Sequence, residues 1–249
     1  MRKLLLTFLF SGTILSAQEK FAVEYRQQNE ANPGKVREFE IEMKQKGSGG
    51  SFKIGGKDLF YQLDYANGIS VFSKIETINN DQSLSTANSS FAIHMGGEHK
   101  ELIGNQSTES FSQDVILDGE NYRVNYPFKN YEWKVTTEEA TILGYKVIKA
   151  IAEKEGITAW FAPEIKVNIG PNQINGLPGL ILKSETQLKN KFETKITMLA
   201  EKINLAPKKS AKLKKSKEKD ITSEEFKKLQ EESKEKFKNS FSIGVDKNK

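Results

Sequence analysis

The fold of this 249-residue chain is decided around the stretch Gly176-Leu177-Pro178-Gly179-Leu180-Ile181. Proline fixes its own φ and pushes Leu177 toward extended backbone, and the two glycines can adopt positive φ. An apolar run, Leu180-Ile181-Leu182, continues directly from the second glycine. The stretch therefore predicts a sharp corner that leads into a buried strand.

Alternating apolar and polar residues predict further strands on both sides of this corner. Phe39, Ile41 and Met43 alternate with charged residues, and Leu59, Tyr61, Leu63 and Tyr65 repeat the pattern. Asn67-Gly68 and Asp118-Gly119 lie between such runs, and both are favoured hairpin turns. More strands are expected at residues 69–72, 115–117, 122–124, 131–135, 145–150, 157–161, 179–184 and 192–200.

Successive strands joined by short turns favour an antiparallel arrangement. About ten strands in one sheet must curl or close to cover their apolar face. We therefore expect a mainly β protein built on a strongly curved antiparallel sheet, a half-barrel or open barrel. Residues 79–112, which are rich in Asn, Ser, Thr and Gly, are expected to form a long loop or a weakly paired excursion.

Three parts are expected along the chain: a signal peptide at 1–17, an antiparallel β domain at 18–205, and a basic linker with a C-terminal helix at 206–249. The helix should begin near Thr222 and Ser223, which suit an N-cap, and should run to about Asn239. Phe226, Leu229 and Phe237 recur at helical spacing and give it a thin apolar stripe.

The first residues have the pattern of a secretory signal. Arg2 and Lys3 precede the apolar residues 4–15, and small residues end at Ala17. The apolar run is shorter than the roughly 20 residues that a membrane-spanning helix needs. The chain has no cysteine, and therefore no site for a lipid anchor. We expect a soluble periplasmic or secreted protein that starts near Gln18 and has no transmembrane segment after cleavage.

The basic character of the chain comes from its tail. Residues 206–249 contain 14 Lys and 8 Asp or Glu, whereas the net charge of the whole chain is +5. The body that precedes the tail is therefore slightly acidic. This distribution does not favour a nucleic-acid-binding surface, and no nucleic-acid partner is expected.

The corner resembles the name-giving motif of the GLPGLI family, which consists of secreted proteins mostly of Bacteroidota without an established molecular activity. The order and spacing of several upstream motifs also fit. They are Trp133, residues 142–150 with Gly144-Tyr145, residues 159–165 with Ala159-Trp160 and Pro163-Glu164-Ile165, and Gly170-Pro171. Many members carry a cysteine where this chain has Val147, which excludes a thiol-dependent role here.

The corner has two interpretations. It is either a structural turn before a strand, or a place where Gly176 and Gly179 let a ligand or partner approach the backbone beside Trp160 and Tyr145. The candidate binding residues are Tyr145, Trp160, Gly176, Leu177, Pro178 and Gly179. The bound species would be an apolar ligand or another envelope protein, because aromatic residues on a curved sheet can line an apolar groove.

A second candidate site contains both histidines of the chain. His94, Met95, Glu98 and His99 lie within six residues, and imidazole with thioether or carboxylate suits copper or zinc. The alternative is a solvated loop without a ligand.

Catalysis has little support in the sequence. There is no thiol nucleophile, no phosphate-binding glycine loop and no metalloprotease helix motif. We therefore expect a non-enzymatic binding or accessory protein that holds an apolar ligand or an extended protein segment on a curved sheet. The alternatives are a metal-handling protein and an interaction subunit of an outer-membrane complex that is contacted through its basic tail. The cofactor, if any, is not indicated.

Overall fold

The computed structural model describes residues 20–47, 58–76, 101–208, 211 and 218–244, with the side chains of the last segment up to Lys236. The strands are β1 Lys20–Glu30, β2 Leu59–Ala66, β3 Ile69–Lys74, β4 Leu102–Asn105, β5 Ser110–Leu117, β6 Glu120–Pro127, β7 Lys134–Ile142, β8 Tyr145–Ala152, β9 Ile157–Ala162, β10 Leu180–Gln187, β11 Lys195–Asn204 and β12 Lys219–Thr222. The helices are α1 Pro33–Gln45 and α2 Ser223–Gly244.

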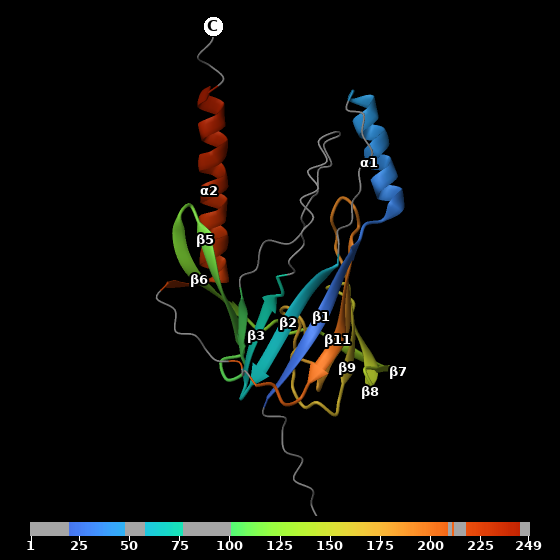
Figure 1. Cartoon of the computed structure of the whole chain (residues 1–249). Coiled ribbons are helices and arrows are strands. Elements are labelled where there is room, and N and C mark those ends of the chain that lie inside the picture. Colours follow the sequence, from blue (N-terminus) through green and yellow to red (C-terminus); the bar gives the residue numbers. More distant parts are fainter. Residues whose placement is uncertain (1–19, 48–57, 77–100, 209–210, 212–217, 245–249) are drawn as a thin grey trace, which may run out of the picture.

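The described strands form one open sheet of twelve, in the order β12-β6-β5-β4-β3-β2-β1-β11-β10-β9-β8-β7. All neighbours are antiparallel except β12, which pairs in parallel with β6. Figure 1 shows the sheet curving from β6 around to β7 and β8. The prediction of a mainly β protein with a curved, open sheet and a C-terminal helix is thus confirmed.

Both predicted two-residue hairpins are present. β2 and β3 are joined through Asn67 and Gly68, and β5 and β6 through Asp118 and Gly119. All four turn residues have positive φ. Local backbone preference was therefore sufficient to place these turns.

The core of the sheet is built from residues that alternate along its central strands. Phe21, Val23 and Tyr25 of β1 are fully buried, and they contact Leu63 and Tyr65 of β2 within the same cluster. The ring of Phe21 stacks on that of Tyr65 with centroids 4.8 Å apart. The alternation predicted for β2 is thus used to pack the inside of the sheet.

Tyr25 connects this core to the corner strand. Its hydroxyl donates a hydrogen bond of 2.7 Å to the backbone carbonyl of Ile181. Complete burial disfavours the phenolate and raises the pKa of Tyr25 far above its ordinary value. The neutral hydroxyl is therefore the form that the folded protein holds.

We expect this burial to make the protein alkali-sensitive. Above a pH of about 10 the unfolded tyrosine ionises while the folded one does not, so the free energy of unfolding should fall as the pH rises. Tyr25→Phe should cost about 1–3 kcal/mol at neutral pH, because it removes a buried hydrogen bond, but it should flatten the alkaline fall. Urea unfolding midpoints between pH 8 and 11.5 test this. Parallel curves for the two proteins would contradict it.

Residues 33–45 form helix α1, so the strand predicted from Phe39, Ile41 and Met43 is wrong. Asn32 caps the helix through a 2.9 Å hydrogen bond from the amide of Gly34, and Pro33 occupies its first turn. The ring of Phe39 meets that of Phe192 in the β10–β11 loop, with centroids 5.4 Å apart. The cap at Asn32 and the contact between Phe39 and Phe192 favour a helix here, although the sequence alternates as in a strand.

Two further predictions need correction. Residues 102–105 and 110–112 belong to β4 and β5, so the end of the predicted long loop is part of the sheet. Strand β7 begins at Lys134, and Tyr131 and Trp133 lie in the preceding connection. A strand of four residues such as β4 is too short to show a distinct alternating pattern.

The tail contributes more to the fold than its composition predicts. Residues 219–222, expected as the end of the linker and the start of a helix, form β12 at the edge of the sheet. Thr222 and Glu225 then make a reciprocal capping box at the start of α2: the Thr222 hydroxyl accepts from the Glu225 amide, and the Glu225 carboxylate accepts from the Thr222 amide. The predicted helix start is thus correct.

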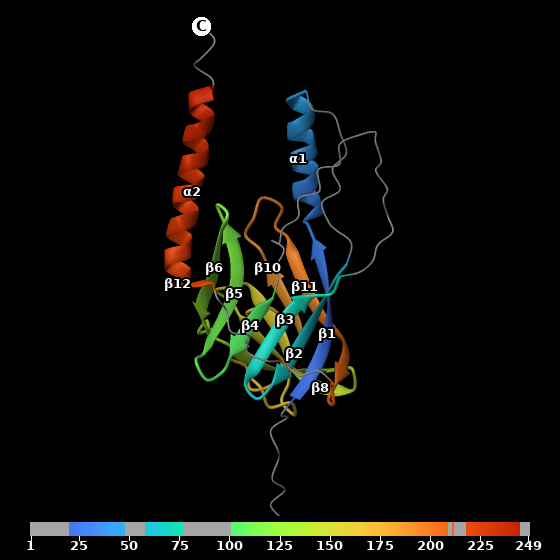
Figure 2. The ribbon, with the colours of Figure 1, turned by 60° about the vertical axis from the view of Figure 1, so that its left-hand side comes forward.

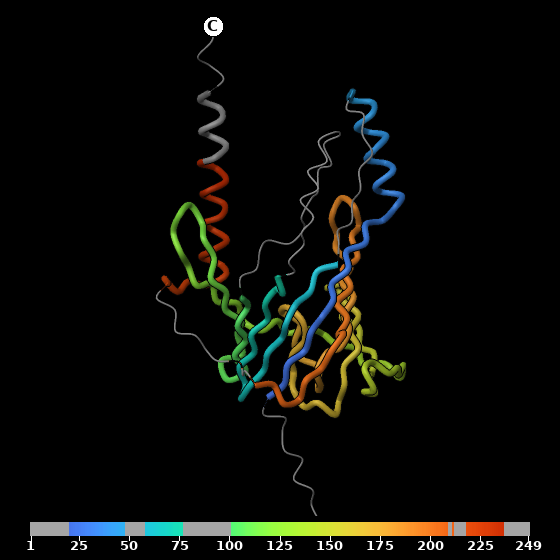
Figure 3. The backbone as a smooth tube through the Cα atoms, in the orientation of Figure 1, coloured from blue at the N-terminus to red at the C-terminus, as the bar shows by residue number. Residues whose placement is uncertain are grey.

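The two helices extend beyond the same end of the sheet, as the views in Figures 1 and 2 agree. The tube in Figure 3 shows that α2 rises beside the β5–β6 hairpin, while α1 rises beside the β10–β11 hairpin. Within the described residues, neither helix is both long enough and apolar enough to cross a membrane. The predicted signal at 1–17 lies outside those residues.

Candidate functional site

The predicted corner exists and is tightly folded. Gly176 has a φ of +91°, and its amide donates a hydrogen bond of 2.9 Å to the carbonyl of Asn168. The amide of Gly179 donates to the carbonyl of Leu177, also at 2.9 Å. Leu177 itself is only 1% exposed. Left-handed backbone at the first glycine is as expected for a residue without a Cβ.

Gly179 is required for a different reason. Its φ is not positive, contrary to the freedom assumed for both glycines. A Cβ at this position would lie 2.3 Å from the carbonyl oxygen of Ala162 and 2.7 Å from its carbonyl carbon. The start of β10 thus passes directly over the end of β9, and only glycine lets the two backbones approach so closely.

Trp133 is the aromatic residue beside the corner. Its indole nitrogen would lie 3.5 Å from a Cβ at Gly176, and it donates a hydrogen bond of 3.0 Å to the carbonyl of Asn175. The Asn175 amide in turn donates to the carbonyl of Lys129 at 3.1 Å. The connection between β6 and β7 therefore covers the corner and ties it to the sheet.

Trp160 and Tyr145 have other surroundings. Trp160 pairs across the sheet with Lys149 and Lys183, whose ammonium groups lie 5.9 and 4.3 Å from the centre of its ring. Tyr145 pairs with Ile142 at the β7–β8 turn and packs against the main core. Apart from its chain neighbours, Trp133 supplies the only described atoms within 4 Å of a Cβ built at Gly176.

Most apolar side chains that could line an inner groove are used for packing. Leu177 joins Phe161 and Ile181 in a second cluster, which Tyr131 and Trp133 cover. Phe21 and Tyr25 in the main cluster have no exposed surface. Leu177 at the corner is thus used for packing. The His94–His99 loop lies outside the described residues, so metal binding there stays a prediction.

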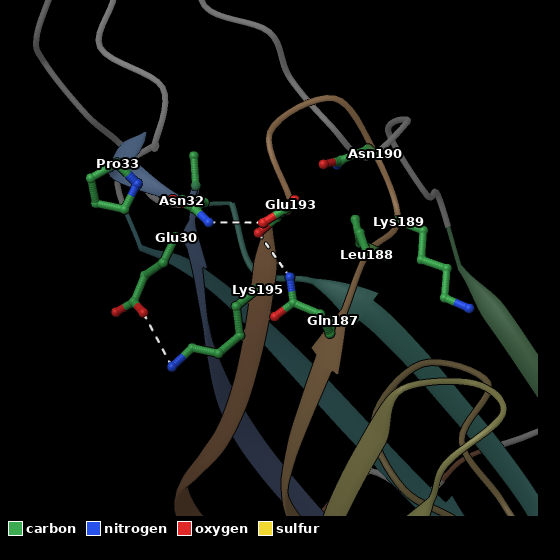
Figure 4. A pocket seen from close by; sticks show the side chains of 10 residues that line it. Glu30, Asn32, Pro33, Gln187, Leu188, Lys189, Asn190, Glu193 and Lys195 are labelled. Atoms are coloured by element: carbon green, nitrogen blue, oxygen red, sulfur yellow. Dashed lines mark hydrogen bonds and ion pairs between the residues drawn. The ribbon is translucent and has the colours of Figure 1, made fainter. Parts of the chain in front are cut away.

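A polar hollow of about 810 Å³ lies where β1 leads into α1 (Figure 4). Its polar side chains pair with one another: Asn32 donates to Glu193 at 2.8 Å, and Lys195 lies 3.3 Å from Glu30. Gln187 donates to the carbonyl of Glu193 at 2.8 Å. These contacts hold the start of α1 and the end of β1 against the β10–β11 hairpin. No ligand is needed to explain why these polar side chains lie together.

The edge at β6 shows how the sheet holds an extended segment. β12 lies along β6 with Ile221 opposite Val124, and these side chains are 7% and 0% exposed. Asn125 donates to Asp220 at 3.3 Å and to the carbonyl of Ile221 at 3.5 Å. This edge was not predicted from the sequence, because four residues after a basic linker give only a weak strand pattern.

Beyond β12, helix α2 makes few contacts with the sheet. Ser233 donates to Asp118 in the β5–β6 turn at 2.8 Å, and Phe226 and Leu229 are half-buried. The end of the sheet therefore holds the tail through a short strand and a small part of the helix.

Residues 151–183 match the model of a family described as "Protein of unknown function (Porph_ging)". The match covers β9, the connection that follows it and the corner, and it is consistent with a GLPGLI-type family. None of the curated proteins compared with the chain matches it.

Two solved structures, both of PNGF-II, are similar in fold to this chain. Structures of PNGF-II in space groups C2 and P21 have TM-scores of 0.50 and 0.51 with 17% identity, over 86% of this chain. The chain spans about a third of the length of PNGF-II, with 33% and 34% covered. NE2245, a LolA superfamily protein from Nitrosomonas europaea, has a TM-score of 0.33 and 7% identity over 79% of this chain and 88% of its own.

Proposed function

We propose that the protein is a non-enzymatic binding or accessory protein, periplasmic or secreted, that holds an extended segment of another envelope protein as an added strand at β6. The observation that carries this proposal is the seating of β12 on that edge. An edge strand offers a row of backbone donors and acceptors, and neighbouring side chains supply selectivity. In the absence of a partner, the chain's own tail occupies the position.

The length of the edge supports exchange of the tail for a partner. β6 has eight residues, whereas β12 pairs with Tyr122, Arg123, Val124 and Asn125 only. A longer partner strand would gain further backbone hydrogen bonds with the flanking residues. That gain must offset the advantage of β12, which competes for the same edge as part of the same chain and therefore at an effective concentration on the order of mM.

Extended protein segments are better supported as ligands than apolar small molecules. Of the aromatic residues on the sheet, Phe21, Tyr25, Tyr61 and Tyr65 are buried in the main cluster, and Tyr145 and Trp160 are half-buried against it. The β6 edge, in contrast, already pairs with an extended segment. The residues of the predicted metal site lie outside the described part of the chain, so no structural observation supports the metal-handling alternative.

Release of the tail should expose the edge. Ile221→Pro removes both a backbone donor and a buried side chain, so β12 should detach while the antiparallel strands stay folded. Stability should fall by no more than about 1.5–3 kcal/mol, the contribution of one buried Ile. A labelled peptide of residues 218–225 should then bind the variant at least about tenfold more tightly than it binds the unmodified chain.

Fluorescence anisotropy measures this binding, and Ile221→Val is the matched control because it keeps the β-branched side chain and the backbone donor. A peptide with proline at position 221 should not bind either protein. If the wild-type peptide fails to bind the Ile221→Pro protein while circular dichroism shows an intact sheet, strand addition at β6 is not the function.

A further inference from the structure

The β6 edge presents a buried cation next to an apolar position. Arg123 is 8% exposed, and its Nε and Nη2 atoms donate to the two carboxylate oxygens of Asp114 at 2.7 and 2.9 Å. The neighbouring Val124 is fully buried. These two residues face positions 220 and 221 of the added strand.

The tail places a carboxylate opposite the cation. Asp220 pairs with Arg123 and receives a hydrogen bond from the amide of Asn125. The Asp114 hydrogen bond chiefly, and then the charges of Asp114, Asp220 and Glu218, raise the pKa of Arg123. Acidic groups of the tail and of β5 therefore both favour the charged guanidinium.

The next tail residue is apolar and branched. Ile221 is 7% exposed beside Val124, so the edge removes most of its side chain from water. A β-branched residue suits this position because its restricted side chain already favours extended backbone. A carboxylate followed by a branched apolar residue is thus the pair that the edge is built to receive.

We infer that the partner segment carries an Asp or Glu opposite Arg123, followed directly by a β-branched apolar residue opposite Val124. This inference rests on the proposed function and adds the chemistry by which the edge chooses its partner. The carboxylate supplies selectivity and orientation, because a positive side chain at that exposed position would be repelled by the guanidinium opposite it. The branched side chain supplies apolar burial.

The rest of the edge sets less stringent requirements. Position 219 faces Tyr122, which is half-buried, and Lys219 opposite it is exposed. Position 222 faces Asn125, and Thr222 is also exposed. Asp220 is exposed as well, but it differs from these two residues because the charge of Arg123 lies opposite it, and Ile221 differs from them because it is buried. Selectivity should therefore concentrate on positions 220 and 221.

In the test the substitutions are made in the peptides, so that every peptide is measured against the same protein. The full chain with Ile221→Pro is titrated with labelled 218–225 peptides: the parent, Asp220→Asn, Asp220→Lys and Ile221→Ala. We expect Asp220→Lys and Ile221→Ala to bind at least about tenfold more weakly, with Asp220→Asn between parent and Lys. Glu224→Lys, which makes the same change in net charge outside the paired residues and their cap, should bind like the parent.

The outcomes separate the two proposals. If no peptide binds, strand addition itself fails. If the parent binds and Asp220→Lys binds as well as Glu224→Lys, strand addition stands but the pairing with Arg123 is overturned. Native mass spectrometry of the unmodified chain provides one more check, because tail-dependent dimers would show that the occupant is a second copy and would overturn a separate partner.

Discussion

Gly179→Ala should destabilise the protein by about 3 kcal/mol or more. The added Cβ would lie 2.3 Å from the backbone carbonyl oxygen of Ala162 at the end of β9, and Gly179 directly precedes Leu180, which pairs with Ala162. No side-chain rotation can relieve such a contact, so β9 and β10 would have to separate. Ile181 follows in β10, and the hydrogen bond from Tyr25 to its carbonyl would be disturbed as well.

Two other glycines serve as controls for this prediction. Gly144→Ala adds a Cβ that meets nothing within 4 Å, but at a φ of +84°, so it should cost only about 1 kcal/mol. Gly176→Ala should cost about the same, with Trp133 at 3.5 Å from the new atom. Urea unfolding of the three variants measures the order. Equal losses for Gly179→Ala and Gly144→Ala would mean that the close approach of the strands is easily relaxed.

Leu177→Ala should cost about 2–5 kcal/mol. Leu177 is 1% exposed and lies in the cluster of Phe161 and Ile181, under the covering rings of Tyr131 and Trp133. Truncation removes this apolar burial and leaves a cavity, because the surrounding strands are held by backbone pairing. The loss should appear as a lower denaturation midpoint with an unchanged m-value.

Two substitutions bracket this effect. Leu177→Met keeps the volume and should cost less than about 1.5 kcal/mol. Ile41→Ala, at a position that is 50% exposed in α1, should change stability by no more than about 0.5 kcal/mol. If Leu177→Ala behaves like Ile41→Ala, then Leu177 is not a packing residue and a binding role for the corner regains support.

The corner can still be tested for a binding role that is independent of stability. A variant at Leu177 or Trp160 that keeps the melting temperature but loses a species that co-purifies with the native protein would support binding there. Losses of binding and stability in proportion would assign the corner to the scaffold. The burial of Leu177 and the position of Trp133 over Gly176 favour the second outcome.

Part of the candidate site was accessible to sequence reasoning. The corner, its positive-φ glycine and the strand that follows were predicted from Pro178 and its neighbours. The aromatic residue beside the corner was not predicted, because Trp160 and Tyr145 are closer to it along the chain. Trp133 precedes Gly176 by more than forty residues, and its indole donates a hydrogen bond to the carbonyl of Asn175. The β6 edge was missed, because nothing in Lys219 to Thr222 distinguishes a strand from a linker.

The amino-acid sequence by itself determined the features that depend on local backbone preference. These are the Asn67-Gly68 and Asp118-Gly119 hairpins, the alternating strands, the turn at Gly176 and the cap of α2 at Thr222. Tertiary structure alone decided that helix α1 docks on Phe192, that Gly179 must lack a Cβ because Ala162 lies against it, and that β12 runs parallel to β6. Each of these depends on a contact between distant segments, and local φ and side-chain preferences contain no information about which distant backbone will lie there.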